Sequence, residues 1–179
     1  GVLEEYVEGD LKTRTRQMHL FQRLVRWWAM KLTEQLAAKN ASKIPKDIPI
    51  LVLEDIESMR EELLFALGEL GFNGAIDAAG SIAEAKSYLD KKEYSFLLFD
   101  WQLPDGSGVK LLNEYQRGHA QKRIPALMCT SKDKVDNILE ALRSGAHNYL
   151  IKPFTLEMLA EKMAYAWDVS MREKKQEDE

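Results

Sequence analysis

The chain has 179 residues, of which 45% are hydrophobic and 30% are charged, and its formal net charge is −4. This composition supports one domain with a sizeable core plus an extension, and the apolar runs fall well short of the roughly 20 residues that span a membrane. No signal peptide is visible. The single cysteine, Cys129, excludes an intrachain disulfide framework and favours a reducing, cytoplasmic setting.

Charge and proline placement divide the chain into parts. Residues 1–47 carry nine Lys or Arg against six Asp or Glu, a net of +3, so the remainder carries −7. Pro45 and Pro49 interrupt a polar stretch through which a helix cannot continue. We therefore predict a basic helical extension and linker at 1–47, a domain at 48–170, and a charged, solvated tail at 171–179.

The extension is predicted to form one long helix over residues 11–39, with Asp10 as its N-cap. Its apolar residues recur at alternating intervals near 3.5, at Leu11, Met18, Phe21, Val25, Trp28 and Leu32. Leu20, Leu24 and Trp27 widen this apolar face beyond a strict coiled-coil seam. Such a face is not stable in water.

Several partners are open for this apolar face. It pairs with its copy in a homodimer or packs on its own domain, since burying aromatic side chains on protein is the ordinary outcome. It could also dock on a specific partner, form the tail of an upstream domain, or meet an anionic membrane or nucleic acid. No helix-turn-helix is visible, so we expect no direct DNA binding. A basic helix face is usually just solvated, so we expect no membrane contact either.

The rest of the chain alternates short apolar runs with helical patterns. Five runs lack strict period-2 alternation, as buried parallel strands do, and they fall at 50–54, 74–78, 95–100, 125–130 and 147–151. Helical spacing, with a capping box at Ser81 and Glu84, predicts helices between or after them at 59–70, 82–89, 108–116, 132–143 and 156–171. The pattern is (βα)5, an α/β fold with a doubly wound parallel sheet.

Five polar residues stand where these apolar runs stop: Glu54, Asp55, Asp100, Thr130 and Lys152. Because the carboxyl ends of parallel strands share one sheet edge, where ligands bind, we expect these side chains to converge. Three acids, a hydroxyl and a lysine suit a hard cation beside a phosphate. The first hypothesis is therefore phosphoryl transfer.

Each of these residues has a chemical role in that hypothesis. Asp100 precedes a loop with proline and glycine and is placed to act as a nucleophile that forms an acyl phosphate. Glu54 and Asp55 can hold Mg²⁺, which offsets negative charge in the transition state. Lys152 adds a positive charge, and the Thr130 hydroxyl can donate to a phosphate oxygen.

A structural alternative exists for each residue taken alone. An acid after a strand is often only a helix N-cap, and Asp55 could cap the helix that starts near Glu57. Capping does not explain acids, a hydroxyl and a lysine from four strands at one edge. The set as a whole therefore favours a functional site.

At this point the sequence closely resembles the receiver domains of two-component response regulators, including the single-domain chemotaxis type. The resemblance covers about residues 48–170. It rests on the acid pair Glu54-Asp55, the phosphoacceptor Asp100 in LLFDWQLPDGSG, the switch residues Thr130 and Tyr149, and Lys152 followed by Pro153 and Phe154. The family implies a flavodoxin-like sheet with strand order 2-1-3-4-5.

The resemblance also implies chemistry at the sheet edge. A sensor histidine kinase would phosphorylate Asp100. Mg²⁺ would be bound by Asp55, Asp100, the main-chain carbonyl of Gln102, and Glu54 directly or through water. The peptide bond between Lys152 and Pro153 would be cis, which would aim the lysine at the site.

It further implies a signalling switch and not an enzyme with a separate substrate. Phosphorylation would draw Thr130 inward and let Tyr149 follow, remodelling a surface that binds an unknown downstream protein. Gln102 and Lys132 flank the route of hydrolytic water in the family, and the long amide of Gln102 is expected to give an acyl phosphate that lasts minutes and not seconds. Tyr149 could instead be an ordinary half-buried strand aromatic.

Three rival interpretations stay open at this stage. A phosphatase or phosphotransferase that uses an aspartyl phosphate would need a second acid near Asp100, where Gln102 stands instead, and a cap domain. The chain could also be a phosphorylation-independent interaction module, or the receiver fragment of a larger multidomain signalling protein.

Overall fold

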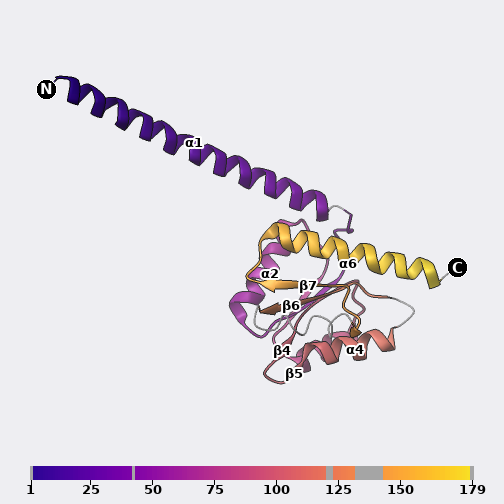
Figure 1. Ribbon diagram of the computed structural model, residues 1–179. Coiled ribbons are helices and arrows are strands. Elements are labelled where there is room, and N and C mark those ends of the chain that lie inside the picture. The colour runs from indigo at the N-terminus through magenta and orange to yellow at the C-terminus, as the bar shows by residue number, and fades with distance from the viewer. Residues whose placement is uncertain (1, 42, 120–122, 132–142, 178–179) are drawn as a thin grey trace. The chain divides into compact units, whose positions relative to one another are not determined.

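The computed structural model describes residues 2–41, 43–119, 123–131 and 143–177 (Figure 1). Side chains in the first helix are described for residues 18–32, 35–36 and 39–41. The chain divides into two compact units, Gly1–Leu36 and Ala37–Glu179.

The described residues of the first unit are all helical. Helix α1 spans Val2–Ala41, which makes it longer than the predicted 11–39 at both ends. The prediction of Asp10 as the N-cap is wrong, because the helix has already begun at Val2. Among the residues described, no helix combines the length and the apolarity that crossing a membrane requires.

The second unit contains the predicted five-stranded parallel sheet. Its strands are β1 (Ile50–Leu53), β2 (Ile76–Ala79), β3 (Phe96–Asp100), β6 (Ala126–Ser131) and β7 (Asn148–Lys152). Their spatial order is β2-β1-β3-β6-β7, and every neighbouring pair is parallel. When only the five strands of this sheet are numbered, in chain order, this is the flavodoxin-like order 2-1-3-4-5 that the sequence analysis predicted.

Four described helices cover the two faces of this sheet. They are α2 (Glu57–Glu69), α3 (Ile82–Lys91), α4 (Gly108–Gly118) and α6 (Leu156–Glu177). Helices α2 and α6 bury their apolar sides on one face, and α3 and α4 bury theirs on the other. Figure 1 shows α6 and α4 on opposite sides of the sheet. Most of the predicted helix at 132–143 lies outside the described residues. The last helix continues to Glu177, beyond the predicted end near Met171, so most of the predicted tail is helical.

The side-chain alternation of the strands explains these two layers. Val52, Leu98 and Leu150 are completely buried in the layer under α2 and α6. Leu53 and Phe99, one residue further along, are buried in the opposite layer. Because successive strand residues point to opposite faces, a strand covered on both sides must be apolar throughout. This is why the predicted strands showed no polar alternation.

A capping box opens α3, as predicted. The Ser81 hydroxyl accepts a hydrogen bond from the Glu84 main-chain N–H at 3.1 Å. The Glu84 carboxylate reaches one residue further back than in the usual box and accepts from the Gly80 N–H at 2.8 Å. Asp105 adds a second cap, since its carboxylate accepts from the N–H groups of Ile82 and Ala83.

The predicted linker packs into the core of the second unit. Ala41, Ile44 and Ile48 are buried in the layer under α2 and α6. The Lys46 ammonium donates to the Ala41 carbonyl at 2.6 Å, and the ideal Cβ of a side chain at Gly74 would lie only 2.4 Å from the Asp47 carbonyl oxygen. The compact unit therefore begins earlier than residue 48.

Replacing Ile44 with Ala is expected to destabilise the second unit. The Ile44 side chain is 1% exposed, so its removal leaves a cavity among residues of α2 and α6. We expect the free energy of unfolding to fall by roughly 2–4 kcal/mol, measured by urea denaturation followed by circular dichroism.

The matched control is Phe65→Ala on α2. Phe65 is larger than Ile44 but 71% exposed, so its removal should change the free energy of unfolding by less than about 0.5 kcal/mol. Equal effects of the two substitutions would contradict the burial of the linker.

Candidate functional site

The predicted residues converge because three of them continue one face of the sheet. Glu54, Asp100 and Lys152 lie two residues beyond Val52, Leu98 and Leu150, so their side chains point to the same side as those core residues. They stand at the carboxyl ends of β1, β3 and β7, where the apolar layer stops. The alternation of side chains along the strands therefore places two carboxylates and an ammonium side by side at the carboxyl edge of the sheet.

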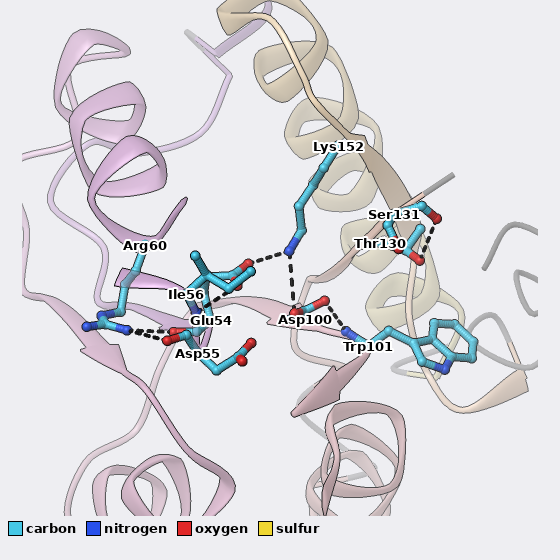
Figure 2. A network of polar contacts seen from close by, with 9 residues as sticks. All are labelled: Glu54, Asp55, Ile56, Arg60, Asp100, Trp101, Thr130, Ser131 and Lys152. Carbon is cyan, nitrogen blue, oxygen red and sulfur yellow. Dashed lines mark hydrogen bonds and ion pairs between the residues drawn. The ribbon is translucent and has the colours of Figure 1, made fainter. Parts of the chain in front are cut away.

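Lys152 is the centre of this group (Figure 2). Its ammonium donates to Oε2 of Glu54 and lies 3.4 Å from Oδ2 of Asp100. The side chains of Lys152, Glu54 and Asp100 are 9%, 0% and 12% exposed. The lysine therefore compensates two carboxylates that are almost withdrawn from water.

Main-chain groups hold the two carboxylates in place. The second oxygen of Glu54 accepts from the Ile56 N–H at 3.2 Å, and Oδ1 of Asp100 accepts from the Trp101 N–H at 2.7 Å. Arg60, one turn into α2, donates to the Glu54 carbonyl at 2.8 Å (Figure 2). The sequence analysis missed Arg60, because an arginine in the first turns of a surface helix carries no distinguishing pattern.

Three carboxylates form a cluster with the composition of a cation site. One oxygen each from Glu54, Asp55 and Asp100 lies within 4.8 Å of the others. Oxygen ligands from one or two carboxylates, completed by water and phosphate, are what Mg²⁺ takes in proteins. The chemistry of this donor set therefore fits magnesium.

Helix capping does not account for Asp55. The N-cap position of α2 is Ile56, and no side chain makes a capping hydrogen bond there. The structural alternative raised from the sequence is thus wrong for this residue. Asp55 instead contributes its carboxylate to the cluster with Glu54 and Asp100.

Burial sets the electrostatics of the site. It raises the pKa of Asp100, an effect that Lys152 opposes, and it raises the pKa of Glu54, to which the charge of Asp100 also contributes. Burial alone would lower the pKa of Lys152, but its hydrogen bond to Glu54 and the two nearby carboxylates outweigh burial and raise that pKa. The lysine is therefore held charged, while the acids are destabilised in their ionised form.

Thr130 and Tyr149 lie on the other face of the sheet. Met128 is paired with Tyr149 and Thr130 with Ile151, so Thr130 and Tyr149 point to the same side, two residues apart along the strands. Thr130 is buried, and its hydroxyl donates to the Ser131 carbonyl at 3.3 Å. The half-buried Tyr149 ring lies 5.1 Å from the Lys162 ammonium of α6.

A small hairpin that the sequence did not predict follows Asp100. Strands β4 (Gln102–Leu103) and β5 (Gly106–Ser107) pair antiparallel. The Gln102 amide donates to the Gly106 carbonyl at 3.2 Å, within the hairpin. Directly after it, a side chain at Gly108 would have its Cβ 1.9 Å from the Asp100 carbonyl oxygen, so only glycine fits there.

Three further residues complete the account of the predicted site. The peptide bond between Lys152 and Pro153 is cis. Lys132, predicted as a tuning residue, lies outside the described residues. Cys129 is buried, and burial raises the pKa of its thiol to about 12, in keeping with a core residue and not a nucleophile.

Comparison with known proteins gives a consistent result. Residues 50–164 match a family model described as the response regulator receiver domain. The chain is 34% identical over 118 residues to chemotaxis protein CheY-3 of Vibrio cholerae serotype O1. The aligned region covers 66% of this chain and 90% of that protein. It is 38% identical over 110 residues to the transcriptional regulatory protein PmrA of Pectobacterium parmentieri, covering 62% of this chain and 48% of that protein.

Solved structures show the same fold. A two-component response regulator from Clostridium difficile aligns with a TM-score of 0.59 and 28% identity, covering 68% of this chain and 96% of that one. The receiver domain of Francisella response regulator 1452 aligns with a TM-score of 0.59 and 23% identity, over 69% of this chain and 98% of that one. Both alignments leave about a third of this chain unmatched.

Replacing Asp100 with Asn is expected to stabilise the metal-free protein at neutral pH. Because burial raises the native pKa of Asp100, stability falls as the pH rises from the ordinary value of 3.8 through the raised native pKa. The amide removes that loss, and we expect the free energy of unfolding to increase by about 1 kcal/mol. Urea denaturation in the presence of EDTA at several pH values measures the change.

The gain should disappear as the pH falls below 3.8, where the Asp100 carboxyl becomes protonated in both the folded and the unfolded state. The control is Asp105→Asn, because hydrogen bonds from the Ile82 and Ala83 N–H groups lower the pKa of Asp105. This substitution should not stabilise the protein. An equal gain in both variants would show that burial of Asp100 is not the cause.

Proposed function

Because the chain belongs to the response regulator receiver family, we propose that it is a phosphorylation-activated switch in which Asp100 accepts a phosphoryl group from a sensor histidine kinase. The observation that carries the proposal is the meeting of Asp100, two further carboxylates and Lys152 at one sheet edge. A carboxylate oxygen of Asp100 would bond to phosphorus as the P–N bond of the phosphohistidine breaks. The electron pair of that bond returns to the imidazole nitrogen.

Magnesium is the proposed cofactor. When bound, Mg²⁺ supplies positive charge that offsets the repulsion between the phosphoryl group and the carboxylates. Asp55, Asp100 and the main-chain carbonyl of Gln102 would hold it. Both oxygens of Glu54 already accept hydrogen bonds, from Ile56 and Lys152, and this supports a contribution of Glu54 through water.

Lys152 and Thr130 are the proposed phosphoryl-binding residues. Lys152 already stands 3.4 Å from the Asp100 carboxylate, so its ammonium needs only a small shift to pair with a phosphoryl oxygen. The Thr130 hydroxyl donates to the Ser131 carbonyl in this structure. Binding phosphate would require it to leave that carbonyl, which makes the hydroxyl a two-position element.

Tyr149 is the proposed second member of the switch. It shares a sheet face with Thr130, on the neighbouring strand. Its ring is linked to α6 through the Lys162 ammonium. A shift of Thr130 would therefore reach the surface formed by β7 and α6, where we propose that a downstream protein binds.

Labelling with beryllofluoride or acetyl phosphate in the presence of Mg²⁺ tests the phosphoacceptor. We expect modification at Asp100, detected by mass spectrometry after borohydride reduction or by ¹⁹F NMR for beryllofluoride, and its complete loss in Asp100→Asn. Removing Mg²⁺ with EDTA should also abolish it, because charge repulsion is then not offset.

The control is Asp105→Asn, which alters the nearest other aspartate after the acceptor and leaves an amide oxygen able to accept from α3. This variant should label as the unchanged protein does. Absence of labelling in the unchanged protein would favour a phosphorylation-independent interaction module instead.

Gln102 and Lys132 are proposed to tune the lifetime of the acyl phosphate. For Gln102, we propose that its side-chain amide leaves the carbonyls of Leu103 and Gly106 and then shields the phosphoryl group from water. Gln102→Ala should then speed phosphate release severalfold, measured with phosphorylated protein freed from the phosphodonor. An unchanged rate would remove Gln102 from the tuning residues.

A further inference from the structure

The middle of α1 carries a regular apolar stripe that is largely exposed. The stripe consists of Met18, Phe21, Val25, Trp28 and Leu32, with alternating spacings of three and four residues. Their side chains are between 50% and 67% exposed. Alternation of three and four is the spacing that keeps one helix face along a neighbouring helix over many turns.

The residues that flank the stripe extend it and carry almost no charge. On one side lie Leu24 and Lys31, and on the other Gln22, Ala29 and Leu36. These are the positions that face each other across a pair of helices. Lys31 is the only charged residue among them, so two copies of this helix would meet without a row of opposed like charges.

Apart from Lys31, the basic residues of this segment lie elsewhere on the helix. His19, Arg23 and Arg26 are placed by the helical period on the side opposite the stripe, and all three are exposed. In a pair of such helices the charges of Arg23 and Arg26 would stay in water, far from the seam. The charge distribution is therefore compatible with self-pairing.

The exposed apolar area is of the size that a stable dimer needs. Seven apolar residues contribute: Met18, Phe21, Leu24, Val25, Trp28, Leu32 and Leu36, each 42–67% exposed. Together they expose on the order of 700 Å², given typical side-chain areas. A standard stable interface takes roughly 800 Å² from each partner.

The second unit offers no comparable stripe among its described residues. Its exposed large apolar side chains are Ile56, Phe65, Met158 and Tyr165. They are scattered over the start and middle of α2 and over α6, and do not form a strip of matching length. A second copy of α1 matches the stripe better than this surface does.

We propose that α1 pairs with α1 of a second copy of this chain through the apolar stripe in residues 18–32. The two receiver units are then joined in one homodimer by a helix whose last residue, Ala41, is buried in the receiver core. This pairing does not depend on the phosphoryl chemistry of Asp100. It is a property of the unphosphorylated protein.

The mass of the full chain in solution tests the pairing. Size-exclusion chromatography with light scattering, over a wide concentration range, should give twice the chain mass of 20.6 kDa. Val25→Glu places two carboxylates in the seam and should weaken the dimer at least about 100-fold, because neither charge gains a partner there. Trp28→Ala, which removes packing without adding charge, should weaken it as well.

The matched control is His19→Glu on the opposite side of α1. Glutamate has good helix propensity in both variants, so helicity by circular dichroism should be kept. His19→Glu should remain dimeric, and Asp100→Asn should also remain dimeric, which separates this test from that of the phosphoacceptor. The urea midpoint of the receiver unit verifies that each variant is folded.

Three results would overturn the proposal. One is a monomer at every concentration. Protection of α1 from protease in that monomer would indicate packing on its own receiver, and ready cleavage would indicate an unpaired helix. Another is a dimer that survives Val25→Glu and Trp28→Ala. The third is a monomer that binds anionic phospholipid vesicles or duplex DNA and loses that binding in Val25→Glu.

Discussion

The ammonium of Lys152 is the interaction on which the rest of the site depends. It projects from the edge strand β7 past β6 and contacts carboxylates at the ends of β1 and β3, so one side chain ties together nearly the full width of the sheet. A buried carboxylate is stable only when its charge is compensated. Lys152 opposes the rise that burial causes in the pKa of Glu54 and of Asp100, so without it the ionised forms of both would be less stable.

The compensation is incomplete, and this matters for chemistry. Glu54, Asp55 and Asp100 together bring three carboxyl groups to the place that one ammonium serves. Burial is the main reason why the pKa of Asp100 is raised even beside a lysine, and the charge of Asp55 adds a smaller contribution in the same direction. A divalent cation would relieve the excess negative charge, and the same cation is what an incoming phosphate requires. The stability problem of the site and its proposed reaction thus have one solution.

The sequence predicted most of the sheet and the convergence of its edge residues, because both follow from strong local signals. Runs such as ILVL and FLLFD are too apolar to lie anywhere but in a doubly covered strand, and a polar residue after each run must fall at the same edge. What the sequence did not show depends on contacts between distant segments. Asp105 caps a helix that begins 23 residues earlier, and Ile44 is buried by helices that start after it. The two-residue strands β4 and β5 are too short to leave a periodic pattern.

The burial of Cys129 has a practical consequence for experiments on this protein. The chain has no other cysteine, and this thiol is enclosed in the core and stays protonated at ordinary pH. Thiol-reactive reagents need both access and the thiolate, and Cys129 offers neither in the folded state. The folded chain as it stands is therefore not expected to react with thiol-directed spin labels or fluorophores. A cysteine introduced on the surface would be modified alone, and distances between labelled sites could be followed without first removing a native residue.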